Sequence, residues 1–341
     1  MLSFLKYLLF PFSWLYALVS WFRNVLFDKN ILKSISFDVP TICVGNLTVG
    51  GTGKTPHIEF LIDVLSVEYE LGILSRGYGR KTKGYRQVND EDTAVEVGDE
   101  PLQIYRKYKN DLTVSVCEDR VFGMTELLKG NPNTGIVLLD DAYQHRWLES
   151  KCKVLLTDYG RLFTKGYCLP TGMLREVRSG ASRASVIVVS KCPKNISIKE
   201  QNSITNSIKK YNNTALVFFS YVAYANAVIE EGEVQPKVVL MSGIAQNKLF
   251  QREVAEVFDI VKSFSFPDHH NYTEKEIKQI AEVAQKEEAT VLMTEKDFVK
   301  IKGTLLEGYL SSVSWGYIPI KINFVGNKNQ EFIETVKSHI I

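Results

Sequence analysis

The stretch from residue 41 to residue 56, Thr-Ile-Cys-Val-Gly-Asn-Leu-Thr-Val-Gly-Gly-Thr-Gly-Lys-Thr-Pro, decides the fold of this chain. Residues 41–44 predict a buried strand, a glycine-rich loop follows, and an apolar periodicity after Pro56 predicts a helix through Leu65. This order is the context of a phosphate-binding P-loop, in which backbone N–H groups and a helix N-terminus converge on an anion. The residues predicted to contact the nucleotide are Thr48, Val49, Gly50, Gly51, Thr52, Gly53, Lys54 and Thr55.

Two side chains of this loop have predicted chemical roles. Lys54 would reach the β- and γ-phosphates, and the Thr55 hydroxyl would ligate Mg²⁺. Thr48 departs from the usual pattern, which begins with a glycine at that position. The alternative is an ordinary glycine-rich turn, but the Lys-Thr pair between a strand and a helix favours a phosphate site.

The overall composition bounds the class of protein. The 341 residues are 45% apolar and 23% charged, which is globular and long enough for two domains. A net charge of +2 gives no general attraction to nucleic acid. The five cysteines are scattered without a C-x-x-C pair, which argues against a disulfide framework and a zinc site and favours a reducing compartment.

Residues 1–30 differ from the rest of the chain. The run from Tyr7 to Phe22 is uncharged, rich in aromatic residues and bracketed by Lys6 and Arg23. It is shorter than the roughly 20 residues of a spanning helix, and aromatic and basic residues favour the headgroup level. We predict an interfacial or half-inserted helix that binds residues 1–27 to a membrane surface. The alternative is a buried helix packed on its own domain, which would rarely be this aromatic without a polar stripe.

A basic loop runs from Arg76 to Arg86 after a strand predicted at residues 70–75. It contains no acidic residue. Such a loop at a strand end near a P-loop suits a second anion or a phosphorylated substrate. Arg76 and Arg80 are stronger candidates than the lysines because a guanidinium has a fixed fork of donors. The alternative is a solvated loop without a specific ligand.

Acidic residues occupy two further positions where they are predicted to act. Asp99 precedes a helix through Tyr108 and is expected to cap it. Asp140 and Asp141 end an apolar strand, the form of a Walker-B strand, whose carboxylate lies beside the P-loop and holds Mg²⁺ or its water. Side chains alternate along a strand, so the two aspartates are not expected to share one task. A loop of polar caps is the alternative.

Alternating strands and helices predict two α/β domains, each with a parallel sheet covered by helices. A P-loop NTPase-like, doubly wound domain is expected over residues 31–222, a linker or hairpin over 223–236, and a smaller α/β domain that closes over the site over 237–341. Ligand sites then lie at the carboxyl ends of the strands. The strand end at residues 190–193, Ser-Lys-Cys-Pro, lacks the aspartate that reads guanine in GTPases.

Seven segments, taken in order, resemble the tetraacyldisaccharide 4′-kinase family, the membrane-associated enzymes of lipid A synthesis in Gram-negative bacteria. They are residues 45–56, 74–80 (Leu-Ser-Arg-Gly-Tyr-Gly-Arg), 98–101 (Gly-Asp-Glu-Pro), 140–145 (Asp-Asp-Ala-Tyr-Gln-His), 174–176 (Leu-Arg-Glu), 268–269 (Asp-His) and 293–297 (Met-Thr-Glu-Lys-Asp). The ordered set is specific and lies within residues 1–300. Ala142 is a departure, since the family usually has glycine after the aspartate pair.

The resemblance implies that ATP phosphorylates the 4′-hydroxyl of a tetraacylated glucosamine disaccharide 1-phosphate at the cytoplasmic face of the inner membrane. It implies that Asp99 orients or deprotonates this hydroxyl with help from His269, while Lys54 completes the catalytic set. The implied Mg²⁺ site comprises Thr55, Asp140, Asp141 and Glu176. The implied contacts to substrate or phosphate are Asn46, Arg76, Tyr78, Arg80, Gln144, His145 and Arg175. No nucleic acid partner is expected, and a monomer is favoured.

Two other classes of protein compete with a kinase. A membrane-anchored P-loop switch or motor would use water as the nucleophile and need ordered switch loops; the basic loop and the missing guanine-reading aspartate favour transfer to a small molecule instead. A non-catalytic nucleotide-binding anchor would leave Asp99, the aspartate pair and Glu176 without a task. Dependence of ATP turnover on added lipid separates the kinase from the switch.

Overall fold

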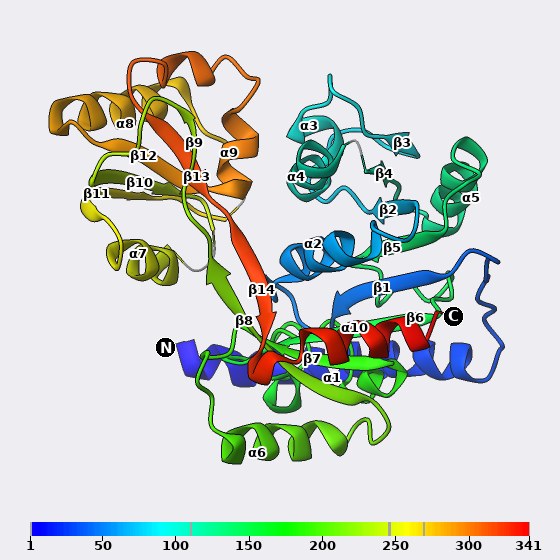
Figure 1. The fold of residues 1–341 in the computed structure, drawn as a ribbon. Helices are drawn as coiled ribbons and strands as arrows, with labels where there is room; N and C mark the ends of the chain where they lie inside the picture. The colour runs from blue at the N-terminus through cyan, green and yellow to red at the C-terminus, as the bar shows by residue number, and fades with distance from the viewer. Residues whose placement is uncertain (1, 110, 245–246, 269, 341) are drawn as a thin grey trace.

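The computed structural model describes residues 2–109, 111–244, 247–268 and 270–340, with side chains from residue 9 onward. The described chain forms two sheets with flanking helices (Figure 1). The strands are β1 (Thr41–Asn46), β2 (Leu71–Ser75), β3 (Arg86–Gln87), β4 (Leu112–Val116), β5 (Ile136–Asp140), β6 (Cys152–Asp158), β7 (Val186–Ser190), β8 (Leu216–Tyr224), β9 (Val228–Glu231), β10 (Lys237–Ser242), β11 (Asp259–Ser265), β12 (Thr290–Thr294), β13 (Trp315–Ile318) and β14 (Ile320–Phe324). The α-helices are α1 (Leu2–Asp28), α2 (Lys54–Leu65), α3 (Ala94–Val97), α4 (Asp99–Tyr108), α5 (Arg120–Gly130), α6 (Ile198–Lys209), α7 (Asn247–Ala255), α8 (Glu274–Glu287), α9 (Glu295–Ile301) and α10 (Asn329–Ser338).

The larger sheet has the strand order β14-β8-β7-β6-β1-β5-β2-β4-β3 and is parallel except at its two edge strands. β1 lies between β6 and β5, and every residue of β1 is buried. Its side chains alternate between two cores: Ile42 and Val44 join the cluster that includes α2 and α4, and Cys43 joins the cluster that includes α5 and α6. Helices on both faces explain why the strands read as unbroken apolar runs, and they confirm the predicted doubly wound α/β fold.

The smaller sheet has the order β11-β10-β12-β13-β9, with β9 antiparallel to β13 and the other pairs parallel. Its core is formed by inward residues of β10 and β12 and by the apolar face of α8. Thr273 begins α8 with a capping box to Glu276, the local signal that sets where this helix starts. The second unit is therefore an α/β layer structure beside the first (Figure 1).

The predicted domain boundaries need correction near the C-terminus. β13 belongs to the smaller sheet, but β14 begins two residues later and pairs antiparallel with β8 in the larger sheet. α10 then buries Phe332 and Val336 in the core of the larger unit. Residues 320–338 therefore complete the P-loop domain rather than the second domain. The segment predicted as a linker, residues 223–236, contains the end of β8 and all of β9.

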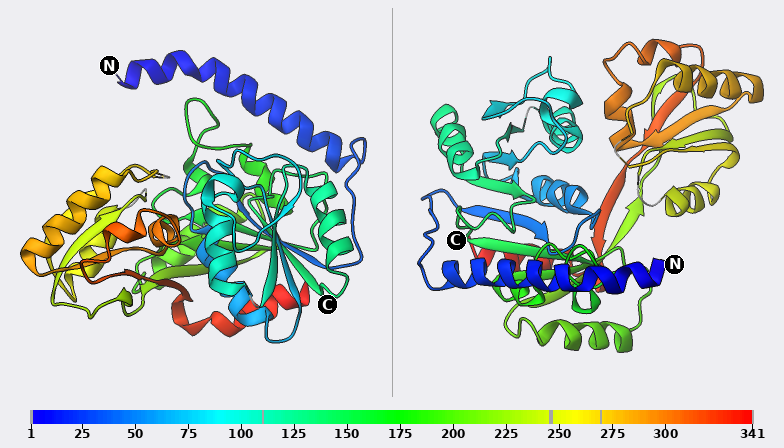
Figure 2. Two further views of the ribbon diagram at one scale, coloured as in Figure 1. Left: turned by 90° about the horizontal axis from the view of Figure 1, so that it is seen from above. Right: turned by 180° about the vertical axis from the view of Figure 1, so that it is seen from behind.

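Helix α1 runs along the outside of the P-loop domain (Figure 2). Its exposed large apolar side chains are Phe10, Phe12, Trp14, Leu15, Tyr16, Leu18, Val19, Trp21 and Phe22. Other side chains of α1 contact the domain, where Ser13 donates to the Thr171 hydroxyl at 2.6 Å and Phe27 packs edge-on against Trp147. Phe10 and Tyr16 are partly exposed but also contact the domain. The alternative of a buried helix packed on its own domain is therefore met in part: α1 packs on the domain, but most of its large apolar side chains are exposed. Among the described residues, no helix is both long and apolar enough to cross a membrane.

Phe332→Ala is expected to destabilise the P-loop domain by about 3–5 kcal/mol, because it leaves a cavity in a closed aromatic cluster. The Phe332 ring is 1% exposed and stacks on Phe324 at a centroid distance of 4.3 Å. Urea unfolding measures the loss. Leu305→Ala, at a side chain that is 92% exposed in the second domain, is the control and should change the stability by less than about 0.5 kcal/mol. An unchanged unfolding midpoint for Phe332→Ala would contradict the packing of α10 on the first domain.

Candidate active site

The P-loop is held from behind through four consecutive carbonyl groups. The donors are Asn46 Nδ2 to Gly50 (3.4 Å), Lys191 Nζ to Gly51 (2.6 Å), Ser190 Oγ to Thr52 (2.8 Å) and His57 Nδ1 to Gly53 (2.6 Å). In a trans peptide the C=O group and the following N–H group point in opposite directions. The N–H groups of residues 51–54 are therefore directed away from these donors, toward the cavity that the loop lines. This arrangement cradles an anion.

The start of α2 strengthens this anion site. Gly53 precedes the helix with φ 82°, a left-handed conformation that glycine adopts without strain, and no side chain caps the first turn. The first N–H groups of α2 thus remain available to a ligand. Burial lowers the pKa of His57 to about 4, so its imidazole is neutral. Because a carbonyl only accepts, Nδ1 carries the proton toward Gly53, and Nε2 accepts from the Ser220 hydroxyl at 2.9 Å.

A cavity of about 1110 Å³ lies between the P-loop and the second domain. Its lining includes most of the predicted site residues: Val49, Gly50, Gly51, Thr52, Gly53, Lys54, Thr55, Arg76, Tyr78, Asp140, Asp141, Gln144, His145 and Arg175. The second domain contributes Leu249, Phe250, Asp268, Thr294, Glu295 and Lys296. The cavity thus brings together residues that are far apart in the sequence and that come from both domains.

Asp140 has a buried carboxylate with one oxygen free for a ligand. Its Oδ2 accepts a hydrogen bond from the Ser75 hydroxyl at 2.9 Å, whereas Oδ1 is buried and has no partner among the described residues. Burial, followed by the nearby charge of Asp141, raises the pKa of Asp140 to about 6. A carboxylate oxygen beside a P-loop threonine is the donor type that Mg²⁺ takes, with nucleotide phosphates and water completing its shell. The residues present therefore fit this ion, although the described part of the chain holds no group of three or more His, Cys, Asp or Glu side chains that could bind a metal by itself.

Asp141 has a different environment from Asp140, as the alternation along the strand predicts. It accepts two hydrogen bonds from Arg175 at 2.9 Å and lies 3.6 Å from the Lys54 ammonium. Burial alone would raise the pKa of Asp141, but Lys54 and Arg175 outweigh it and lower that pKa. Asp141 also has φ 50°, so the left-handed turn after β5 falls on this residue and not on Ala142.

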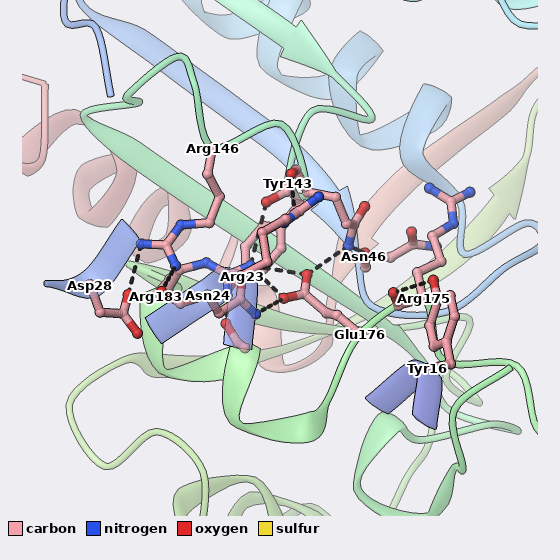
Figure 3. Close-up of polar contacts among 12 residues, drawn as sticks. Tyr16, Arg23, Asn24, Asp28, Asn46, Tyr143, Arg146, Arg175, Glu176 and Arg183 are labelled. Atoms are coloured by element: carbon pink, nitrogen blue, oxygen red, sulfur yellow. Dashed lines mark hydrogen bonds and ion pairs between the residues drawn. The ribbon is translucent and has the colours of Figure 1, made fainter. Parts of the chain in front are cut away.

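Glu176 does not fit its predicted role as a magnesium ligand. Its carboxylate is 1% exposed and accepts hydrogen bonds from Arg183, Asn24 and Gln144, all between 2.9 and 3.0 Å (Figure 3). These donors occupy both oxygens, and Glu176 does not line the cavity. Its observed task is structural, because it ties α1 to the loop that carries Gln144.

Three other predicted ligands hold the site together from outside the cavity. Asn46 is buried and donates to the Thr52 hydroxyl at 2.9 Å. Thr48 is buried and forms a bridge to Leu174, so neither residue lines the cavity. Arg80 is outside the lining too; its Nη2 donates to the Gly84 carbonyl at 2.6 Å and to Glu118 at 2.8 Å, which shapes the basic loop, while its Nε and Nη1 have no partner among the described residues.

Asp99 lies at the start of α4, but it does not cap this helix as predicted. Gly98 is the N-cap residue, with φ 94°, and Asp99 is the first helical residue. The Asp99 carboxylate pairs with Lys300 of α9 at 3.1 Å. Asp99 itself is not part of the cavity lining, whereas its neighbour Glu100 is. His269, the predicted partner of Asp99, lies outside the described residues.

Among the charged residues of the cavity that the sequence did not predict as site residues are Arg120 and Glu100. Arg120 is 3% exposed, donates to the Cys117 and Glu118 carbonyls, and leaves Nε without a partner among the described residues. Glu100 lines the cavity and pairs with Lys296 at 3.2 Å. Arg120 follows directly on a strand end and a predicted helix start, a position that signals a ligand site in parallel sheets.

Comparison with known proteins agrees with this geometry. The family model described as "Tetraacyldisaccharide-1-P 4'-kinase" matches residues 5–340. The tetraacyldisaccharide 4′-kinase of Flavobacterium johnsoniae is 41% identical over 346 residues, covering 99% of this chain and 98% of the relative. That of Flavobacterium psychrophilum is 43% identical over 337 residues, covering 96% and 95%. The crystal structure of "apo" form LpxK from Aquifex aeolicus in complex with ATP has a TM-score of 0.77 and 27% identity, covering 99% of this chain and 100% of that one.

Asp140→Asn is expected to stabilise the metal-free protein at pH 7.5. The pKa of Asp140 is about 6 in the folded state against an ordinary value of 3.8, so the folded protein binds this proton more tightly and loses relative stability as pH rises through that window. Removing the carboxyl should recover at most about 3 kcal/mol, with the gain vanishing near pH 4. Thermal unfolding from pH 4 to pH 8 measures it.

Asp141→Asn is the matched control, because it breaks the pairs with Lys54 and Arg175 and should lower stability at pH 7.5. A difference between Asp140→Asn and wild type that does not change with pH would contradict the raised pKa of Asp140.

Proposed function

Because this chain belongs to the tetraacyldisaccharide-1-P 4′-kinase family, we propose how its own residues transfer the γ-phosphoryl group of ATP to the 4′-hydroxyl of a tetraacylated disaccharide 1-phosphate. The chain is an ATP-dependent phosphotransferase with an alcohol as acceptor and acts in lipid A biosynthesis. The observation that carries the assignment of residues is the P-loop, in which the carbonyls of residues 50–53 all accept hydrogen bonds on the side away from the cavity.

The nucleotide side of the reaction depends on preorganised charge. The N–H groups of residues 51–54 and the start of α2 would bind the phosphates, while Lys54 would neutralise charge on the β- and γ-phosphates. Lys54 lies 3.6 Å from Asp141, which holds its ammonium at the mouth of the loop. Because these donors are fixed before the nucleotide arrives, little reorganisation is needed in the transition state.

We assign the magnesium site to Thr55 and Asp140. Asp140 supplies the unpartnered Oδ1, and Thr55 supplies a hydroxyl at the second position of α2. The chemistry that bound Mg²⁺ supplies there is neutralisation of charge on the phosphate oxygens. Asp141 keeps Lys54 and Arg175 in place at the edge of this site.

The acceptor hydroxyl requires a group that accepts its proton. We assign this role to Asp99, with His269 as the assisting residue that the family resemblance implies. Asp99 occupies the N-terminus of α4, next to Glu100 in the cavity wall, and its charge is held by Lys300. Arg76, Tyr78, Gln144, His145 and Arg175 line the same cavity and are the proposed contacts to sugar and phosphate.

The outer face of α1 is proposed to bind the membrane that carries the lipid substrate. Its exposed aromatic and aliphatic side chains suit the boundary between headgroups and acyl chains. Tyr16 donates to the Arg175 carbonyl at 2.7 Å, and Arg23 donates to the Gln144 carbonyl at 2.7 Å. The helix that would lie on the membrane thus contacts the residues that would bind the substrate. The cytoplasmic face of the inner membrane and a monomeric state remain parts of this proposal.

Asp99→Asn is expected to lower kcat for phosphate transfer from labelled ATP to the disaccharide lipid by at least about a hundredfold, with ATP affinity within a few fold of wild type. Asparagine keeps the shape of the side chain but cannot accept the proton. Lys300→Met removes the ion pair while keeping the carboxylate, so it should be much milder. Wild-type kcat in Asp99→Asn would end the general-base assignment, and a wild-type protein that turns over ATP without needing lipid would favour the switch over the kinase.

Phe12→Glu combined with Phe22→Glu is expected to weaken binding to vesicles that contain anionic lipid by at least about tenfold, since each side chain loses roughly 1.5–3 kcal/mol of burial. Both side chains are exposed, so the melting temperature should not change. Co-sedimentation with vesicles measures binding. Val67→Glu, at an exposed position outside α1, is the control. Equal sedimentation of the two variants would refute α1 as the membrane contact.

A further inference from the structure

The motif Thr294-Glu-Lys-Asp297 opens α9 and divides its contacts between the two domains. Thr294 caps the helix by accepting from the Asp297 N–H at 3.2 Å, and the buried Asp297 carboxylate accepts from the Gly243 N–H at 2.9 Å. These contacts fasten α9 within the second domain. Glu295 and Lys296, in contrast, reach side chains of the first domain.

Lys107 of α4 connects Glu295 to the helix that follows the P-loop. Its ammonium lies 2.7 Å from the Glu59 carboxylate in α2 and 3.1 Å from the Glu295 carboxylate in α9. Glu59 is 4% exposed, and its other oxygen accepts from Gln103 at 2.8 Å. One ammonium is therefore shared between two buried carboxylates that belong to different domains.

The neighbouring residue of α4 binds the other end of α9. Arg106 Nη1 donates to the carbonyls of Val299 and Lys302 at 2.6 and 2.7 Å. These groups belong to the C-terminal turn of α9, whose carbonyls lack partners within the helix. Arg106 and Lys107, which are consecutive in α4, thus bind the two ends of α9. Val299 of α9 also packs into the hydrophobic core of the first domain.

Lys107 is the group that keeps the Glu59 and Glu295 carboxylates from repelling each other at this contact between the two domains. Without its ammonium, the Glu59 and Glu295 carboxylates would face each other where water is largely excluded, and like charges there repel strongly. Burial already raises the pKa of Glu59, and Glu295 raises it further while Lys107 opposes both effects. At the other end of α4, Lys296 and Lys300 of α9 pair with Glu100 and Asp99. Helices α4 and α9 therefore form a contact between the two domains, and α4 also carries Asp99, which is proposed to accept the proton of the substrate hydroxyl.

We propose that Lys107 is a positioning residue for phosphoryl transfer: by joining α2 to the start of α9, it sets the orientation of the second domain relative to the nucleotide site. The proposal rests on the kinase function above. Lys107 does not line the cavity, so it acts through the placement of other residues. A misplacement of reacting groups by about 1 Å costs on the order of a hundredfold in rate, which makes kcat the sensitive quantity.

The first test is Lys107→Met in the full chain. We expect kcat for transfer to lipid to fall at least tenfold, with ATP affinity within threefold of wild type. Adding Glu295→Gln to Lys107→Met removes one of the opposed charges and should recover at least threefold of the lost kcat. Lys109→Met is the matched control, since Lys109 ends the same helix but pairs with exposed Asp90 at 3.0 Å, within the first domain.

The second test measures domain orientation directly. Ile198→Cys and Val257→Cys place spin labels at exposed positions on the first and second domains, and all five native cysteines are buried. The distance distribution between the labels should broaden or shift in Lys107→Met and stay unchanged in Lys109→Met.

Two results would overturn the proposal. One is a kcat for Lys107→Met equal to that of Lys109→Met. The other is a loss of kcat no larger than the loss of folded protein measured from melting curves, together with an unchanged distance distribution. That result would mean that Lys107 only stabilises the fold. If wild type itself fails to phosphorylate the lipid, the proposed function falls, while the distance measurement still decides whether Lys107 orients the second domain.

Discussion

The hydrogen bonds behind the P-loop are the constraint on which the rest of the site depends. A loop that presents its N–H groups to an anion must place its carbonyls somewhere, and a buried carbonyl without a donor is costly. Here the donors come from β1, α2 and the end of β7: Asn46, His57, Ser190 and Lys191. These strands and the helix must take their places in the fold before the loop can bind phosphate. Phosphate binding by the loop therefore requires the strand order of the larger sheet.

This requirement explains why several residues predicted as ligands are buried outside the cavity. Asn46, Thr48 and Glu176 are polar, lie near the loop and form part of segments that resemble a kinase, yet all three are buried in contacts with the protein. Their contacts hold the surrounding segments in place, so that Lys54 and Asp140 stay positioned to bind a ligand. In a site that stabilises charge with preorganised donors, the buried residues contribute by fixing the positions of the hydrogen-bond donors before the ligand binds.

The sequence was most informative where a local pattern determines a local structure. The glycine spacing of the P-loop and the apolar strand before Asp140 both predict what the structure has, because each depends on neighbours in the chain. The sequence was less informative where a partner comes from far away. The sequence around Glu176 does not predict its hydrogen bonds with Asn24 and Arg183. The sequence around Phe332 does not predict its ring contacts with Phe324 and Phe218. Asp99 shows the limit within one turn: an aspartate before a helix favours a cap, but the left-handed Gly98 takes that position instead.

The course of the chain between the two sheets has a consequence for the order of synthesis. The second domain leaves the first through β8 and returns through β14, and the two crossing points are adjacent, with the Ala225 N–H donating to the Pro319 carbonyl at 2.9 Å. The second domain is thus a continuous insertion, and everything from β9 to β13 is synthesised before β14 and α10. The nucleotide-binding domain is begun before the second domain and completed after it, so its aromatic core around Phe324 cannot close until β14 and α10 have been synthesised.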